Sequence, residues 1–287
     1  MKRVLITGAQ GLLGKEIAKV FRSAGFDVRE TDRTELDVAD LAACREAVAS
    51  IHPEMVIHCA AYTAVDRAES EEKAAFALNE EGTRNVATAC RESGALVVTF
   101  GTDYVFDGTL GRPYREEDPV NPLSVYGRSK LAAEEALRES DCEHLLVRTQ
   151  WLYGPGGKNF IATILDKARK GDALKVASDQ TGSPTFTRDL AAAVLGLTEA
   201  GARGTVHFSN EGETSWFELA RFAIEKERLS GVTLIPAATR DLPYPAPRPA
   251  YSVLDKEKYR GITGNSPRPW DEAVEEFLFV ISVGGAV

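Results

Sequence analysis

Tyr126 and Lys130 are two residues of this 287-residue chain whose types and spacing could move a proton. They lie four residues apart, so in a helix both side chains would lie on one face, one turn from each other. A phenol titrates near pH ~10, and a neighbouring ammonium favours the phenolate and lowers that pKa. Such a pair suits proton transfer to or from a sugar or alcohol oxygen. The same spacing also occurs by chance in many helices, so its meaning depends on the surrounding elements.

The composition excludes several functional classes. With 44% hydrophobic and 27% charged residues, the chain is typical of a globular protein. Its net charge of −9 argues against a nucleic acid or an anionic membrane as the main partner. No apolar run is long enough for a signal peptide or a membrane span, so we expect a cytoplasmic protein. The four cysteines and four histidines lack metal-ligand spacing, which predicts free thiols and no metal site.

A glycine-rich turn opens the chain. A buried strand expected over 2–7 precedes Gly8, Gly11 and Gly14, and a helical pattern follows to about residue 24. In this order, glycines let backbone amides approach a pyrophosphate, and the helix N-terminus adds a favourable dipole. The spacing is G-x-x-G-x-x-G rather than G-x-G-x-x-G, and a plain turn between strand and helix is the alternative.

A second expected strand, 27–31, ends at an acid followed by a base. Asp32 lies 18 residues beyond Gly14, near the position of an acid that accepts from a ribose 2′-hydroxyl. Arg33 could instead meet a 2′-phosphate, so the choice between NADH and NADPH stays open. Asp37 could cap the following helix or reach the adenine amine.

Strands and helices alternate through residue 150, which predicts an α/β fold with a Rossmann-like, doubly wound parallel sheet. Ligands bind at the carboxyl ends of such strands. Ala60 and Ala61 follow one strand and would let a flat cofactor lie close to the backbone. Thr102 follows another; its hydroxyl could donate to a substrate carbonyl or merely satisfy a turn.

One long helix is expected over 71–92, and it carries Asn79. This side chain could bond nearby backbone or serve the site. Beyond residue 150, Trp151 could be a core residue or stack on a base or sugar ring. The turn-rich segment 179–185 resembles a ligand-facing loop, and four prolines predict an extended segment over 240–250.

The last third predicts a smaller substrate-binding lobe whose pieces interleave with the first part. We expect a dinucleotide-binding domain over 1–150, with returns near 183–208 and 240–255. The lobe would then comprise 151–182, 209–239 and 256–287.

Seven motifs together resemble the extended short-chain dehydrogenase/reductase superfamily and, more narrowly, the dTDP-4-dehydrorhamnose reductase family. They are TGAQGLLG at 7–14, AAYTAVDRAE at 60–69, GTDYVFDG at 101–108, NPLSVYGRSK at 121–130, RTQWLYG at 148–154, DQTGSPT at 179–185 and RPAYSVLD at 248–255. The glycine turn and Tyr126/Lys130 mark the whole superfamily. The motifs at 60–69, 101–108 and 179–185 are far more specific.

The resemblance implies an NAD(P)H-dependent reduction of the C4 keto group of dTDP-6-deoxy-L-lyxo-4-hexulose to dTDP-L-rhamnose. Tyr126 would protonate the C4 oxygen, and Lys130 would bind the nicotinamide ribose and lower the pKa of Tyr126. Thr102 would bond the same oxygen from a position usually held by Ser. The residues lining the cofactor would be Gly11, Leu12, Leu13, Asp32, Asp37, Val38, Ala60, Ala61 and Tyr62, and those contacting the nucleotide sugar would be Thr102, Asp103 and Trp151.

Two other functions fit the same resemblance. An epimerase or dehydratase could use the scaffold, although a dehydratase usually has an acid where this chain has Tyr104. A non-catalytic regulatory subunit is the second alternative, and the intact Thr102, Tyr126 and Lys130 weigh against it. Tyr62 and Tyr251 depart from the pattern of the family. The sequence leaves open a homodimer or another oligomeric state, and a metal at a subunit contact.

Overall fold

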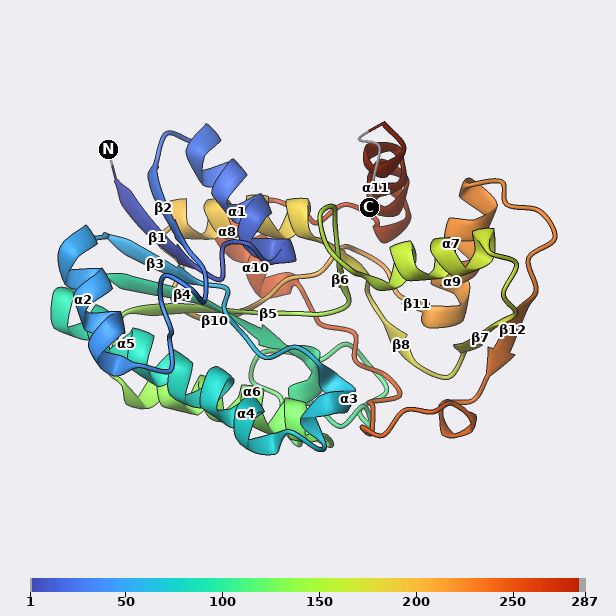
Figure 1. Cartoon of the computed structure of the whole chain (residues 1–287), viewed down its shortest axis with the longest axis horizontal. Helices are drawn as coiled ribbons and strands as arrows, with labels where there is room; N and C mark the ends of the chain where they lie inside the picture. Colours follow the sequence, from blue (N-terminus) through green and yellow to red (C-terminus); the bar gives the residue numbers. More distant parts are fainter. Residues whose placement is uncertain (1, 284–287) are drawn as a thin grey trace.

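A six-stranded parallel sheet dominates the computed structural model, which describes residues 2–283 (Figure 1). Residue 1 and residues 284–287, at the ends of the predicted segments 1–150 and 256–287, lie outside the described residues. The strand order is β10-β5-β4-β3-β1-β2. The strands are β1 (Arg3–Thr7), β2 (Asp27–Thr31), β3 (Met55–His58), β4 (Leu96–Thr102), β5 (His144–Thr149) and β10 (Gly204–His207). The predicted Rossmann-like α/β fold is confirmed.

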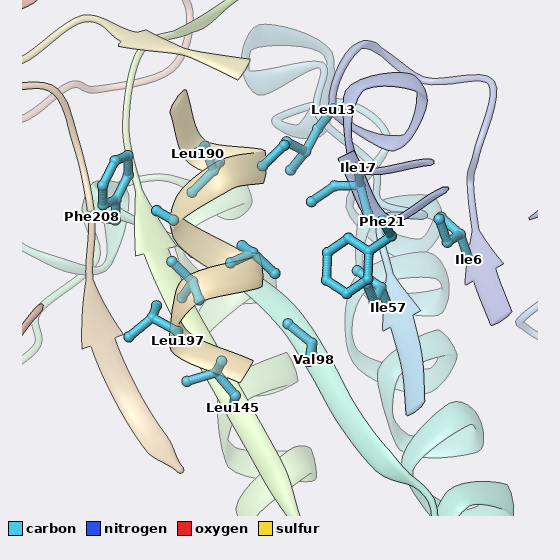
Figure 2. Packing of buried hydrophobic residues seen from close by; sticks show 14 of the residues in the cluster. Ile6, Leu13, Ile17, Phe21, Ile57, Val98, Leu145, Leu190, Leu197 and Phe208 are labelled. Atoms are coloured by element: carbon cyan, nitrogen blue, oxygen red, sulfur yellow. The ribbon is translucent and has the colours of Figure 1, made fainter. Parts of the chain in front are cut away.

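Helices cover both faces of this sheet. Successive strand residues point to opposite sides, so apolar residues of one strand contribute to a core on each face. Val4 and Ile6 of β1 belong to one buried cluster and Leu5 to another. Figure 2 shows the first cluster, where Phe21 and Leu190 pack with strand residues. The helices are α1 (Leu12–Ser23) and α8 (Thr187–Glu199) on that face, and α2 (Leu41–Ile51), α5 (Gly82–Ser93) and α6 (Val125–Glu139) on the other.

A second hydrophobic core lies at the end of the molecule away from β1 and β2 (Figure 1). Tyr153 stacks on Phe186 within it, and Phe277 meets both rings edge-on. Its strands form three pairs: β6 (Leu152–Tyr153) with β9 (Thr185–Phe186), β7 (Leu174–Ala177) with β12 (Leu234–Ala237), and β8 (Thr181–Gly182) with β11 (Thr214–Ser215). The remaining long helices are α7 (Phe160–Arg169), α9 (Trp216–Lys226) and α11 (Trp270–Val283), with the short α10 (Glu257–Thr263).

The structure corrects two expectations about helices and strands. The expected helix 71–92 is divided into α4 (Glu72–Phe76), a π-helical turn at Ala77–Glu81 and α5, and a short α3 (Val65–Ala68) precedes it. The π-helical turn carries the buried Asn79. Such turns interrupt an α-helix with a wider turn and occur frequently at functional sites. The sequence also did not predict β12 and α10. β12 contains a proline and is largely exposed, and α10 has only 7 residues. No helix within residues 2–283 has the length and apolar character needed to span a bilayer.

A buried ion pair attaches α6 to the sheet. Glu134 of α6 accepts two hydrogen bonds from Arg148 of β5, at 2.9 and 2.7 Å, and these side chains are 1% and 3% exposed. Gly101 of β4 makes room for the pair, since a Cβ there would lie 2.7 Å from both side chains. Burial lowers the pKa of His207 to about 3, so its neutral ring accepts from Arg148 at 3.4 Å. The Glu134 carboxylate and the Arg148 guanidinium are therefore both hydrogen-bonded beneath α6.

Replacing one member of this pair tests how strongly it stabilises the fold. Glu134→Gln leaves the Arg148 charge buried and uncompensated, so we expect the free energy of unfolding to fall by about 3–5 kcal/mol. Glu139→Gln on the same helix is the matched control. Glu139 is 67% exposed and pairs with Arg84 at 3.3 Å, so its loss should cost less than about 1 kcal/mol. Urea denaturation measures both, and equal losses would contradict the role given to the buried pair.

Candidate active site

The first two turns of α6 carry Tyr126 and Lys130 on one face, as the sequence predicts. Ser124 caps the helix by accepting from the Gly127 backbone N–H at 3.1 Å. Gly127 is needed here because a Cβ would lie 2.4 Å from the Tyr104 carbonyl oxygen. The close approach places the start of α6 directly against the turn that follows β4.

Burial controls the titration of the Tyr126 phenol. It raises the pKa of Tyr126 to about 12, a hydrogen bond with Thr102 opposes the rise, and the nearby charge of Asp103 adds to it. The expected lowering by Lys130 is not observed in this structure. The Lys130 amine donates to the Phe100 carbonyl oxygen at 2.7 Å, and burial lowers its own pKa to about 8 while Glu134 opposes the change. Desolvation therefore outweighs charge attraction at both groups.

Thr102 ends β4 and fulfils the turn alternative while remaining next to the phenol. Its hydroxyl oxygen accepts from the Tyr104 backbone N–H at 3.2 Å, which caps a short 3₁₀ turn at Asp103–Val105. The same hydroxyl donates to Asp103 at 3.2 Å. Asp103 is 1% exposed, and burial raises its pKa to about 7. Thr102, Asp103 and Tyr126 thus form one cluster at the carboxyl end of β4.

The glycine turn has the close backbone packing that a pyrophosphate cradle requires. Gly8 has a φ of +64°, and a Cβ there would lie 2.6 Å from the Ala60 backbone nitrogen. A Cβ on Gly14 would lie 2.5 Å from the Gly8 carbonyl oxygen. Gly11 is the N-cap of α1 and makes no side-chain capping bond, so the first N–H groups of α1 have no side-chain cap. These residues fit a bound dinucleotide phosphate.

The segment after β2 holds its carboxylates in local turns. Asp32 accepts from the Thr34 backbone and hydroxyl at 2.7 Å each, which lowers the pKa of Asp32, while Arg33 is exposed. The alternative that Asp37 caps the next helix is wrong. Asp37 accepts from Ala39 at 3.1 Å, and Asp40 caps α2.

Some expected cofactor residues have side chains that pack in the interior. Val38 is buried against α5, and its carbonyl accepts from Asn85 at 3.0 Å. Leu13 belongs to the core under α1, whereas Leu12 is partly exposed and packs near Gly157. Any cofactor contact by Val38 or Leu13 would therefore be made by main-chain atoms more readily than by side chains.

Asn79 joins the loop after β3 to α6. Its amide oxygen accepts from the Tyr62 backbone N–H at 2.8 Å, and its amide nitrogen donates to the Tyr62 carbonyl at 3.1 Å. The same nitrogen donates to the Ser129 hydroxyl of α6 at 2.9 Å. Asn79 thereby fixes the chain that follows the half-buried Ala60 and Ala61. Sequence reasoning missed Ser129, although a polar residue between Tyr126 and Lys130 on a buried helix face was a usable signal.

Trp151 follows β5 with a φ of +47°, a strained conformation for a bulky residue. Its ring stacks on Trp216 with centroids 3.6 Å apart and planes 11° apart. A Cβ on Gly182 would lie 2.6 Å from the same ring. One face of Trp151 is therefore covered by Trp216, and the contact of the Trp151 ring with Gly182 links the loop after β5 to the segment 179–185. Over residues 2–283, no group of three or more His, Cys, Asp or Glu side chains is placed to hold a metal ion.

Comparison with known proteins gives a consistent family. The model of the family described as the RmlD substrate binding domain matches residues 1–282. A dTDP-4-dehydrorhamnose reductase from Streptomyces griseus is 42% identical to this chain, over 96% of this chain and 92% of that protein.

Two solved structures have nearly the same fold over the full length. A dTDP-4-dehydrorhamnose reductase from Clostridium acetobutylicum superposes with a TM-score of 0.94 at 38% identity, covering 98% of this chain and 99% of that one. A dTDP-4-dehydrorhamnose reductase from Bacillus anthracis, solved in complex with NADP, also has a TM-score of 0.94, at 37% identity, covering 97% and 99%.

Gly8→Ala tests the cradle. The added Cβ must displace the backbone at Ala60, and the alanine must adopt a left-handed backbone conformation. We therefore expect NAD(P)H to bind about tenfold more weakly or worse. Gly196→Ala in α8 is the matched control, because a Cβ there has open space and no positive φ to adopt. Fluorescence titration of NADPH measures both affinities, and unchanged binding by Gly8→Ala would argue against the cradle.

The lowered pKa of Lys130 predicts a specific pH dependence of stability in the protein without ligand. Between pH 8 and 10.5 the unfolded chain keeps a proton on this amine that the folded chain has lost, so the free energy of unfolding rises with pH. Lys130→Met removes that contribution. We therefore expect the stability of the wild type to gain roughly 3 kcal/mol on the variant across this window. Denaturation series at each pH measure the difference; parallel curves would refute the burial of the ammonium.

Proposed function

The chain belongs to the family described as the RmlD substrate binding domain, and we propose that it reduces the C4 keto group of dTDP-6-deoxy-L-lyxo-4-hexulose with NAD(P)H to give dTDP-L-rhamnose. It is an oxidoreductase that acts on a nucleotide sugar. The observation that carries the proposal is the cluster of Thr102, Tyr126 and Lys130 at the end of β4, joined through Asn79 to the loop beside the glycine turn.

Tyr126 is the proton donor of the reduction. Its raised pKa of about 12 keeps the phenol protonated at neutral pH, so the acid is ready when substrate binds. Bound NAD(P)H supplies the hydride to C4. The C4 oxygen gains negative charge, is a stronger base than the phenolate, and takes the Tyr126 proton while the Thr102 hydroxyl bonds the same oxygen. The Lys130 ammonium, one helical turn away, stabilises the phenolate that remains.

Residues 1–150 bind the dinucleotide in this proposal, with returns near 183–208 and 240–255. The parallel pairing of β10 with β5 in the main sheet supports including the first return. The second core supports parts of the substrate-binding lobe proposed over 151–182, 209–239 and 256–287, because its buried residues, apart from Phe186, come from the first two segments and from α11. Tyr259 of α10, within the third segment, packs instead in the first core. Within the lobe, Trp151 contacts the nucleotide sugar together with Thr102 and Asp103. Gly8, Gly11 and Gly14 hold the pyrophosphate through their main chain, and Asp32 or Arg33 meets the adenine ribose.

The reaction assay uses purified protein, NADH or NADPH, and a panel of dTDP 4-keto sugars that differ in the configuration of the ring carbons. We expect one NAD(P)H to be oxidised for each sugar reduced, with the L-lyxo ketosugar preferred. Turnover without net loss of NAD(P)H would favour an epimerase. Absence of turnover with every sugar, while NADPH binds normally, would favour a regulatory subunit and overturn the proposal.

Tyr126→Phe removes the proton donor and keeps the ring. We expect kcat to fall by about 10²–10⁴-fold with NADPH affinity retained. Tyr259→Phe is the matched control, since Tyr259 of α10 packs on Phe208 in the first core. Steady-state kinetics and NADPH titration measure both effects. A Tyr126→Phe enzyme with wild-type kcat would assign the proton donor elsewhere.

A further inference from the structure

The motif at 248–255 has no role in the chemistry described so far. Its part 250–255 is an extended segment, here called the strap. Thr181 and Tyr251 form a parallel bridge: the Thr181 N–H donates to the Ala250 carbonyl at 2.7 Å, and the Ser252 N–H donates to the Thr181 carbonyl at 2.9 Å. The strap is thus attached through its backbone to the segment 179–185.

The other side of the strap contacts the chain that follows β4, at Gly108 and Tyr114. Tyr114 and Leu254 form a second parallel bridge, with the Tyr114 N–H donating to the Val253 carbonyl at 2.8 Å. A Cβ on Gly108 would lie 2.7 Å from the Ala250 nitrogen, so strap and loop pack backbone to backbone. The strap therefore has a fixed position beside the end of β4.

From this position, one strap side chain reaches the active-site cluster. The Ser252 hydroxyl donates to Oδ2 of Asp103 at 2.6 Å, and Ser252 is 2% exposed. The other carboxylate oxygen, Oδ1, accepts from the Thr102 hydroxyl at 3.2 Å. One oxygen of Asp103 is therefore held by the strap, and the other faces the hydroxyl that lies beside Tyr126.

We propose that Ser252 is a positioning residue for the substrate: it fixes the Asp103 carboxylate so that Oδ1 accepts a hydrogen bond from a hydroxyl of the bound sugar. The inference rests on the proposed function, because it needs the C4 oxygen of the sugar at Thr102. Thr102 and Asp103 are adjacent, so the hydroxyl that Asp103 accepts is one close to the C4 oxygen. An ionised carboxylate only accepts, and it would therefore select a sugar that carries a hydroxyl there.

The charge of Asp103 makes this role measurable. Burial raises its pKa to about 7, and the hydrogen bond from Ser252 is the largest of the effects that oppose the rise. Tyr104 and Tyr126 face the carboxyl group, and both have a raised pKa far above neutrality. Arg248, at the start of the motif, interacts with Tyr104.

Two further charged groups lie nearby. Asp66 pairs with Arg248 at 2.8 Å, and Lys130 of α6 titrates close to pH 8. Neither group contacts Ser252 through a hydrogen bond or ion pair recorded for residues 2–283. The difference in the pH dependence of KM between the wild type and Ser252 variants therefore reports the titration of Asp103.

Ser252→Ala is the first test, in the full-length enzyme with NADPH and the L-lyxo ketosugar. Without the hydrogen bond the pKa of Asp103 rises, so less of the carboxylate is ionised at pH 7. We expect KM for the sugar to rise about fivefold at pH 7, because the ionised fraction falls from about a half to about a tenth, with kcat changed less than about threefold. The pH below which KM increases should move upward by roughly one unit. NADPH affinity should remain that of the wild type.

Tyr251→Phe is the matched control. It removes a hydroxyl from the neighbouring strap residue, where the Tyr251 hydroxyl donates to Glu213 at 2.7 Å on the exposed side. We expect wild-type KM and pH profile. Ser252→Thr keeps a hydroxyl at the same place and should restore the pH profile. If Ser252→Ala and Tyr251→Phe have the same KM and the same pH profile, the inference is overturned.

A double-mutant cycle with Asp103→Asn separates positioning from a general effect on the strap. If Ser252 acts through the charge of Asp103, Ser252→Ala should change KM less than about twofold in the Asp103→Asn background and leave no pH break to move. An equal fivefold effect in both backgrounds would assign Ser252 a role independent of Asp103. Failure of the wild type to oxidise NADPH with any sugar would instead overturn the proposed function, so the two failures are distinguishable.

Discussion

The burial of charge under α6 is the constraint on which the rest of the structure depends. Tyr126, Lys130 and Glu134 follow one another at turn spacing; Lys130 and Glu134 are buried against the sheet and Tyr126 is half-buried. Each needs a partner, and the sheet supplies one: Thr102 for the phenol, the Phe100 carbonyl for the amine and Arg148 for the carboxylate. A shift of α6 along the sheet would separate these side chains from their partners. Such a shift is costly, because a buried polar group without a hydrogen-bond partner destabilises the fold.

The same burial sets the chemistry. Desolvation keeps the phenol of Tyr126 protonated and lowers the pKa of the Lys130 amine to about 8. In an exposed pair, the ammonium would instead lower the pKa of the phenol. A protonated phenol suits an enzyme that must deliver a proton to a newly reduced oxygen. In the proposed mechanism Lys130 acts on the phenolate after the transfer rather than on the phenol before it. The dry environment therefore suits a reductase as much as the identity of the residues does.

Close backbone packing brings the site together from distant parts of the chain. Gly8 against Ala60, Gly108 against Ala250 and Gly127 against Tyr104 are three places where a Cβ would force segments apart. Through these contacts the glycine turn, the loop after β4 and the strap meet at one edge of the sheet. Hydrogen bonds from Asn79 and Ser252 then fix the side chains that the backbone has brought near each other.

The sequence by itself determined the parallel sheet, because alternating apolar strands and amphipathic helices have few other arrangements, and the spacing of Tyr126 and Lys130 predicted that one helix carries both. Glycine spacing after β1 likewise predicted a turn with a close backbone approach. Only the tertiary structure decided the π-helical turn at Asn79, the sign of the pKa change at Tyr126 and the contact of Ser252 with Asp103, 149 residues apart. Local patterns report which face of an element is apolar, whereas desolvation and long-range hydrogen bonds depend on which elements finally pack against each other.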